Sequence, residues 1–345
     1  MNLYPSKTPL VTVLMPVYNG EPYLRSALES ILSQTFSDFE FLIIDDGSMD
    51  GSAAIVESYT DPRIRHERNG ANLGLIKTLN NGLDLARGRY VARMDCDDIS
   101  LPSRLARQVA FMENHPEIAV CGACFRKFGA VNKTVFCKTD PESIRCGLLF
   151  DAMVGHPAAV MRRDILDRFS LRYDPEYQNA EDYHLWTQIA GHASLANLGE
   201  VLLHYRVHPC QVTHRMAEGQ RQMAGKIRLS QLLSMGISPS RREFELHQAI
   251  STCSYPELPD LFRLAEDWLC TLKSVNDASG IFPEGAFSRI LVERWLTFCK
   301  KGISAGRCSP RMLFFHHLSK ATGLGMGFLA RFCLEYPGRY FRGLR

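Results

Sequence analysis

Residues 90–100 read Tyr-Val-Ala-Arg-Met-Asp-Cys-Asp-Asp-Ile-Ser, an apolar start followed by three closely spaced acids. The Tyr-Val-Ala start predicts a buried strand, so Asp95, Asp97 and Asp98 fall at its carboxyl end. Carboxylates this close together repel one another unless water solvates them or a cation lies between them. The stretch therefore predicts either a metal site or a solvated turn in which Asp98 or Ser100 caps the next helix.

Upstream of these acids, short apolar runs alternate with amphipathic segments. Strands are expected at residues 10–15, 39–44 and 64–67, and helices at about 22–32, 53–59 and 76–86. Repeated strand–helix alternation predicts an α/β protein with a doubly wound, mostly parallel sheet. Ligands of such sheets gather beyond the carboxyl ends of the strands. The polar loops expected at that edge are 16–21, 45–48, 69–74 and 95–100.

Downstream of the acids the same pattern continues to about residue 210 and then changes. The expected elements are a helix near 105–112, strands at 118–128 and 199–206, an extended segment at 155–161 and a helix at 180–190. Beyond residue 210 helical patterns dominate, at 227–233, 242–250, 258–274, 287–300 and 311–335. We therefore expect an α/β domain at residues 1–215 and an α-helical extension at residues 216–345.

A hydrophobic content of 46% with 22% charged residues predicts a folded chain, but its charge is unevenly distributed. Residues 211–345 carry 19 basic and 11 acidic side chains, a balance of +8, so residues 1–210 carry −5 when the whole chain carries +3. An acidic first half does not favour nucleic acid as its partner. Residues 300–345 combine nine basic residues and one acid with many aromatic side chains. This segment suits either peripheral membrane contact or packing on the protein, and both alternatives stay open.

The chain holds 11 cysteines and shows no signal-peptide pattern. These features predict reduced thiols and a cytoplasmic location, at the inner face of the cell membrane if residues 300–345 bind it. Cys121 and Cys124 lack a second pair to complete a zinc site, so we expect them to be buried strand cysteines. No run of 18 apolar residues predicts a membrane-spanning helix.

Several polar residues of the expected loops have chemistry of their own. Asp95 and Asp97 lie two positions apart, so in an extended backbone both carboxylates address one ligand. Asp46 follows the second strand, where it accepts a hydrogen bond from the imide N–H of a uracil or thymine ring, caps a helix, or does both. Tyr18 offers a stacking surface for a base. Lys77 lies in the first turns of the helix expected at 76–86, where it either reaches a phosphate or is an ordinary solvated lysine.

Five stretches share a family pattern: Val13-Leu-Met-Pro-Val-Tyr-Asn-Gly20, Ile43-Ile-Asp-Asp-Gly-Ser-Met-Asp-Gly51, Asn72-Leu-Gly-Leu75, Ala86-Arg-Gly-Arg-Tyr-Val-Ala-Arg-Met-Asp-Cys-Asp-Asp98 and Ala180-Glu-Asp-Tyr-His-Leu-Trp186. In this order and spacing they resemble the family 2 glycosyltransferases of the GT-A fold. The resemblance covers about residues 8–210. It implies inverting transfer of one sugar, hexosyl in type, from a nucleotide diphosphate donor, UDP- or dTDP-linked, to a hydroxyl acceptor. A cell-surface glycan or a lipid-linked acceptor is the implied partner.

The resemblance also assigns a nucleotide site. The implied nucleoside pocket consists of Pro16, Val17, Tyr18, Glu21 and Asp46. Asn72 and Lys77 would lie by the ribose and the phosphates, and Asp95 would contact the ribose or the metal.

The remaining implied roles concern the metal and the proton. Asp97 would hold a divalent metal, and His208, in the Tyr-Arg-Val-His ending, would complete the metal site. The nitrogen donor of His208 favours Mn²⁺ over Mg²⁺. Asp182 would be the general base, with Glu181 as the alternative, because neighbours on a helix point about 100° apart and only one should face the site. His156 would border the sugar or the acceptor, or else lie at the edge of the core.

A single base is sufficient for direct displacement with inversion. Processive polysaccharide synthases resemble this domain but carry Gln-x-x-Arg-Trp soon after the base, whereas Arg294-Trp295 lies more than a hundred residues after Asp182. A polymerase is therefore disfavoured. Two other classes stay open: a catalytically silent nucleotide-sugar-binding or scaffolding protein on this fold, and a nucleotidyltransferase. A nucleotidyltransferase would be expected to carry a glycine-rich phosphate-binding loop after the first strand, and Pro16-Val-Tyr-Asn-Gly20 does not supply one.

Overall fold

The computed structural model describes residues 8–209, 216–313 and 317–324. The chain divides into two compact units, one of residues 1–139 and 154–220 and one of residues 140–153 and 221–345. The boundary expected near residue 215 stays a prediction. The segment 140–153, from the middle of the chain, belongs to the second unit.

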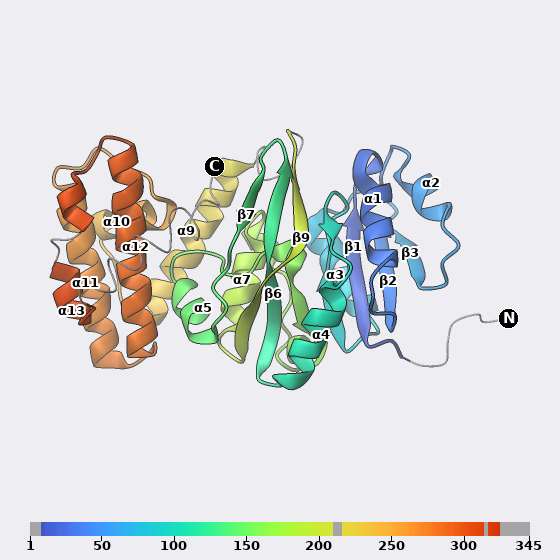
Figure 1. Cartoon of the computed structure of the whole chain (residues 1–345), viewed down its shortest axis with the longest axis horizontal. Helices are drawn as coiled ribbons and strands as arrows, with labels where there is room; N and C mark the ends of the chain where they lie inside the picture. Colours follow the sequence, from blue (N-terminus) through green and yellow to red (C-terminus); the bar gives the residue numbers. More distant parts are fainter. Residues whose placement is uncertain (1–7, 210–215, 314–316, 325–345) are drawn as a thin grey trace. The chain divides into compact units, whose positions relative to one another are not determined.

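The first unit is built on one mixed sheet (Figure 1). The strands are β1 (Val11–Val17), β2 (Phe39–Asp45), β3 (Ile64–Arg68), β4 (Tyr90–Arg93), β5 (Ile99–Ser100), β6 (Ile118–Gly129), β7 (Lys133–Val135), β8 (Val160–Arg162) and β9 (Ser194–Val207). Their order is β3-β2-β1-β4-β8-β6-β9-β5, with β7 paired to β6. Strands β1 to β4 pair in parallel, as do β6 and β9, and the other pairs are antiparallel. The expected α/β class with a mostly parallel sheet is confirmed.

Helices cover both faces of this sheet. Alternate residues of β1, among them Val13 and Met15, pack with the apolar faces of α1 (Glu21–Leu32) and α4 (Arg104–Asn114). Leu14 points the other way, toward Gly82 of α3 (Leu75–Leu85), where a Cβ atom would lie only 2.3 Å from the Leu14 Cδ1. The period of two along the strand therefore produces the doubly wound layers. The other helices of this unit are α2 (Ser52–Glu57), α6 (Arg163–Arg168) and α7 (Glu181–Ile189).

Two local predictions in this unit were wrong. Pro16 and Val17 belong to β1 and not to a loop, and Pro16 is aligned with Ile44 of β2. A proline fits there because β1 pairs with β4 only as far as Leu14, so no second ladder needs its missing N–H. The segment expected to be extended from residue 155 begins with a 3₁₀ turn at His156–Ala158 and becomes strand only at β8.

The second unit is helical, as expected. Its helices are α5 (Pro141–Gly147), α9 (Ala217–Ser234), α10 (Arg241–Thr252), α11 (Leu261–Ser279), α12 (Glu284–Ser304) and α13 (His317–Thr322). Where the structure describes the helix expected at 311–335, it shows a 3₁₀ turn at Pro310–Leu313 and the short α13. Residues 314–316 and 325–345, with most of the basic aromatic segment, lie outside the described residues. None of the helices in the described ranges has both the length and the apolar character to cross a bilayer.

Backbone carbonyls of the 140–153 segment anchor it in this helical unit. The Arg228 Nε donates to the Phe150 carbonyl at 2.7 Å, and the His247 Nε2 lies 3.0 Å from the Leu149 carbonyl. The Trp268 Nε1 donates to the His247 Nδ1 at 3.3 Å, so the proton of this imidazole must be on Nε2. Burial lowers the pKa of His247 to about 3, which keeps this tautomer neutral.

Candidate active site

Three acids lie together where β4 ends. Asp95, Asp97 and Asp98 each offer an oxygen within 4.8 Å of the others. The His208 Nε2, just beyond β9, lies 3.0 Å from the Asp97 Oδ2. Carboxylate oxygens with one imidazole nitrogen suit Mn²⁺ or Mg²⁺. The fully buried Asp98 Oδ2 has no hydrogen-bond partner among the described residues, so the residues present fit a divalent cation.

Burial controls the protonation of this cluster. It raises the pKa of Asp98 well above its ordinary value, and the charges of Asp95 and Asp97 add to the effect. Burial also raises the pKa of Asp95, although the guanidinium of Arg93 opposes the rise. The Cys96 thiol, between these acids, has its pKa raised by burial and by the two neighbouring carboxylates, so it stays protonated. A bound cation would relieve this crowding.

The alternative prediction, that Asp98 or Ser100 caps the next helix, was wrong. Helix α4 begins after Ser103, whose side chain makes no capping bond. Asp98 Oδ1 instead accepts the backbone N–H of Arg206 in β9 at 2.8 Å, and the Arg206 Nε donates to the Asp97 carbonyl at 2.7 Å. The backbone N–H of Ser100 donates to the Ser30 Oγ. Asp98 thus ties the acid loop to the strand that carries His208.

The loops after β1 and β2 are joined by hydrogen bonds at the same edge. The Asn19 N–H donates to the Ser48 Oγ at 3.0 Å, and the Gly51 N–H donates to the Glu21 carboxylate at 2.8 Å. Pro16 and Val17 are buried at the end of β1, whereas the Tyr18 ring is 47% exposed and open to a ligand. These contacts join the loop that carries Tyr18 and Glu21 to the loop that follows Asp46.

Asp46 holds the loop that follows β3. Its Oδ1 accepts the Asn69 side-chain amide and the Leu73 N–H, both at 2.8 Å, and its Oδ2 accepts the Gly74 N–H at 3.0 Å. Asp46 caps no helix, because Gly51 precedes α2. In the same loop the Asn72 Oδ1 accepts from Gly74. Asn72 is exposed, as is Lys77 on the first turn of α3.

The candidate bases lie at the start of α7. Glu181 is 6% exposed, and burial raises its pKa. The charge of Asp95 also acts on Glu181, so the start of α7 and the acid cluster share one electrostatic environment. Asp182 is half-buried, and its Oδ1 accepts the Tyr183 N–H at 2.7 Å.

His156 has a partner that the sequence did not suggest. The His156 Nε2 lies 2.9 Å from the Tyr173 hydroxyl, and both side chains are buried. Burial, with the guanidinium of Arg93 nearby, lowers the pKa of His156 well below its ordinary value, so the imidazole is neutral. The Asn80 side chain of α3 bonds both the N–H and the carbonyl of Tyr173, at 2.9 and 2.8 Å. No pattern in the sequence links residues 93 positions apart.

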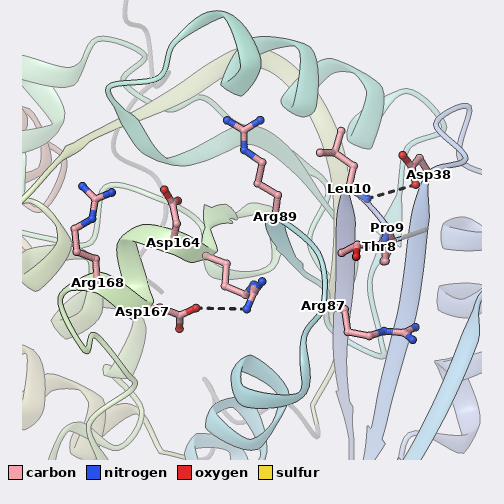
Figure 2. A pocket seen from close by; sticks show the side chains of 10 residues that line it. Thr8, Pro9, Leu10, Asp38, Arg87, Arg89, Asp164, Asp167 and Arg168 are labelled. Atoms are coloured by element: carbon pink, nitrogen blue, oxygen red, sulfur yellow. Dashed lines mark hydrogen bonds and ion pairs between the residues drawn. The ribbon is translucent and has the colours of Figure 1, made fainter. Parts of the chain in front are cut away.

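A hollow of about 800 Å³ lies at the opposite, amino-terminal edge of the strands (Figure 2). Its lining mixes arginines with acids, and the residues are Thr8, Pro9, Leu10, Asp38, Arg87, Arg89, Arg163, Asp164, Asp167 and Arg168. Several of these arginines already pair with acids, Arg89 with Glu113 and Arg163 with Asp167. None of the predicted site residues lines this hollow.

Comparison with known proteins agrees with this geometry. Residues 12–194 match the sequence model of the family described as glycosyl transferase family 2. An uncharacterized glycosyltransferase of Haemophilus influenzae is 33% identical over 233 residues, 64% of this chain and 72% of that protein. The Escherichia coli UDP-Glc:alpha-D-GlcNAc-diphosphoundecaprenol beta-1,3-glucosyltransferase WfgD is 30% identical over 224 residues, 62% of this chain and 83% of that protein.

Two solved structures share the fold. S. aureus TarS 1–349 in complex with UDP-GlcNAc has a TM-score of 0.56 at 18% identity, over 96% of this chain and 93% of that one. The mannosyltransferase PcManGT from Pyrobaculum calidifontis, in complex with GDP-Man and Mn2+, has a TM-score of 0.53 at 17% identity, over 96% of this chain and 88% of that one. At such identities the likeness shows the fold, and the expected GT-A architecture is confirmed.

Proposed function

The chain belongs to glycosyl transferase family 2, and from this premise we propose that it is an inverting, metal-assisted transferase of a single hexosyl group. The observation that carries the proposal is the Asp97–His208 pair in the acid cluster, at the edge where the predicted nucleotide loops meet. The charge of Asp95 acts on Glu181, and this supports the assignment of the base to the start of α7.

The donor would be a UDP- or dTDP-sugar. Pro16, Val17, Tyr18, Glu21 and Asp46 would hold the nucleoside, and Asp95 would contact the ribose or the metal. Asn72 and Lys77 would lie along the ribose and diphosphate, where Lys77 acts as a point charge. Two similar proteins support this donor class, since the name of WfgD includes UDP-Glc and TarS was solved with UDP-GlcNAc.

Asp97 and His208 would hold the divalent cation, Mn²⁺ or Mg²⁺. When bound, it would supply positive charge to offset the charge that develops on the departing diphosphate. Asp182 would accept the proton of the acceptor hydroxyl as that oxygen attacks the anomeric carbon from the side opposite the diphosphate. One base and one displacement give inversion without a carboxylate nucleophile. We favour Asp182 over Glu181 because it is the less buried of the two.

His156 would border the sugar or the acceptor, presenting a neutral imidazole held by Tyr173. The acceptor would be a cell-surface glycan or a lipid-linked sugar, reached from the cytoplasm at the inner face of the membrane. The names of similar proteins support this context: WfgD is named for a diphosphoundecaprenol-linked sugar, and AmsE of Erwinia amylovora is named for amylovoran biosynthesis.

The test compares Asp97→Ala and Asp182→Asn with Asp164→Asn, a matched control on the exposed Asp164 at the amino edge. Transfer and hydrolysis of UDP-, dTDP- and GDP-sugars are measured with Mn²⁺, along with the thermal shift that each nucleotide causes. We expect both site variants to lose about 10³-fold in transfer. Only Asp97→Ala should also lose the Mn²⁺-dependent thermal shift, and the control should match the wild type.

Each part of the proposal has its own contrary outcome. Near-full turnover by Asp182→Asn would show that the base is misassigned. A product whose anomeric proton coupling matches the donor configuration would exclude inversion. A wild-type protein that binds the nucleotides but neither transfers nor hydrolyses any sugar would favour the catalytically silent alternative.

A further inference from the structure

Arg93, the last residue of β4, lies directly against the acid cluster. Its side chain is 3% exposed, and its Nη1 forms an ion pair with the Asp95 Oδ2. Residues two apart in an extended backbone point to the same side, which brings this guanidinium to that carboxylate. The Arg93 Nε is buried without a hydrogen-bond partner in the described part of the chain. A buried donor without a partner costs folding free energy, so the unpaired Arg93 Nε needs a physical explanation.

A neighbouring arginine shows what a purely structural buried guanidinium looks like. Arg162, in β8 beside β4, is 4% exposed. Its Nε and Nη2 donate to the carbonyls of Ile118 and Met112 at 3.2 and 2.9 Å, and its Nη1 lies 3.2 Å from the Tyr90 hydroxyl. Each of its nitrogens is satisfied by fixed groups of the fold. Arg93 differs, because it faces an acid and keeps an unpaired donor.

The charge balance of the site depends on Arg93. An arginine side chain stays protonated in proteins, so the guanidinium beside Asp95 is a permanent positive charge. Its charge also acts on Glu181 and His156. A cluster of bare acids would attract a metal ion but repel the diphosphate that arrives with it. A fixed cation beside Asp95 removes part of that repulsion.

We propose that Arg93 is a positioning residue that fixes the Asp95 carboxylate and supplies the positive charge that lets the acid cluster accept a metal-bound nucleoside diphosphate. The inference rests on the proposed function. A charge-supplying role of Arg93 has a consequence that a role in the fold alone would not have. Removal of Arg93 makes the site more negative. Affinity for Mn²⁺ alone should then hold or rise, whereas affinity for the nucleoside diphosphate should fall.

The experiment uses the full chain and two separate readouts. Mn²⁺ binding is followed by the electron paramagnetic resonance of the free ion, and binding of UDP, dTDP and GDP by calorimetry at saturating Mn²⁺. The variants are Arg93→Met, Arg93→Lys, Asp95→Asn and the double variant Arg93→Met/Asp95→Asn. The double variant avoids an unpaired buried carboxylate if Arg93→Met folds poorly. Arg89→Met is the matched control. Arg89 directly precedes the same strand, and its ion pair with Glu113 is about half exposed.

We expect Arg93→Met to weaken binding of the best nucleotide about tenfold while Mn²⁺ binds equally well or more tightly. Arg93→Lys should recover most of the nucleotide affinity, and Arg89→Met should match the wild type. The double variant should bind the nucleotide no worse than Asp95→Asn alone, because the two groups act as a pair.

Two results would overturn the inference: wild-type nucleotide affinity in Arg93→Met, or equal losses of Mn²⁺ and nucleotide affinity that Arg93→Lys does not repair. A wild-type protein that binds none of the three nucleotides would instead refute the proposed function. The two failures are distinguishable, because the first appears only in the variants.

Discussion

The two edges of the parallel strands both carry charge, but they use it differently. At the amino edge the Glu40 side chain, 3% exposed, accepts the Thr12 hydroxyl at 2.6 Å and both the backbone N–H and the Nε of Arg87. At the carboxyl edge the Asp98 Oδ2 and the Arg93 Nε are buried without hydrogen-bond partners among the described residues. A satisfied buried network stabilises a fold, whereas buried polar atoms left open cost stability and mark a place for a ligand.

The hollow at the amino edge supports the same contrast (Figure 2). Its arginines provide positive charge, yet acids and carbonyls of the protein already occupy much of their bonding capacity. At the carboxyl edge, by contrast, buried polar atoms of Asp98 and Arg93 lack hydrogen-bond partners among the described residues. Buried polar atoms without hydrogen-bond partners, next to groups whose pKa values are shifted, are therefore a better guide to the site than the size of a hollow.

The largest effect that would test this contrast is at Asp46. Asp46→Ala removes three charge-assisted hydrogen bonds that hold the 69–74 loop. We expect nucleotide affinity to fall about 100-fold, because such bonds contribute about 1.5–3 kcal/mol each and part of the loss is absorbed by loop relaxation. Calorimetry with UDP and Mn²⁺ measures it, with Asp84→Ala on α3 as the exposed control. If Asp46→Ala kept its nucleotide affinity but lost much stability, the polar groups of the carboxyl edge would serve the fold, as those of the amino edge do.

Glu40→Gln tests the amino edge and should have the opposite signature. The amide nitrogen that this substitution introduces would face either the Arg87 guanidinium or the Thr12 hydroxyl. In either orientation the buried side chain at position 40 loses one hydrogen bond. We expect the free energy of unfolding in urea to fall by about 2 kcal/mol, with kcat/KM for sugar transfer unchanged. A loss of transfer in proportion to the loss of stability would show that the two edges are not independent.

The smallest effect concerns pH and Glu181. Burial raises the pKa of Glu181, so the ionised form destabilises the folded state. This group's contribution to stability is complete below the unfolded pKa of about 4.3 and is lost as pH rises through the raised folded value. In the metal-free protein, Glu181→Gln should therefore gain stability over the wild type as pH rises from 4.5 to 7.5. Thermal melts in chelator across that range measure the difference, and a constant difference would mean that Glu181 is not perturbed.

The sequence was a good guide wherever the signal is local. The alternation of apolar runs placed β1 to β4, and the helical periods placed α1, α3, α4 and α7, within a few residues. It was poor for short elements without strong periodicity, since α5, α6 and β5 were not expected. The order of polar loops at strand ends predicted that residues such as Asp46, Asp97 and Tyr18 would share one edge, and the structure places them there.

The sequence could have suggested Arg93, because it stands two positions before Asp95 in a strand and so shares its side. No comparable signal points to Tyr173 beside His156, or to Asp98 bonding the backbone of Arg206 across 108 positions. The sequence also gives no signal that the 140–153 segment belongs to the helical unit, because the segment is held there through backbone carbonyls, which every residue has.

By itself the sequence determined the α/β class, the edge at which the acids lie and the set of residues that could do chemistry there, because strand and helix periods are properties of neighbouring residues. Only the tertiary structure decided which acids form ion pairs and which buried polar atoms lack hydrogen-bond partners among the described residues. Those outcomes depend on strand register and loop path, which bring distant residues within hydrogen-bonding distance and set how much water each charge retains.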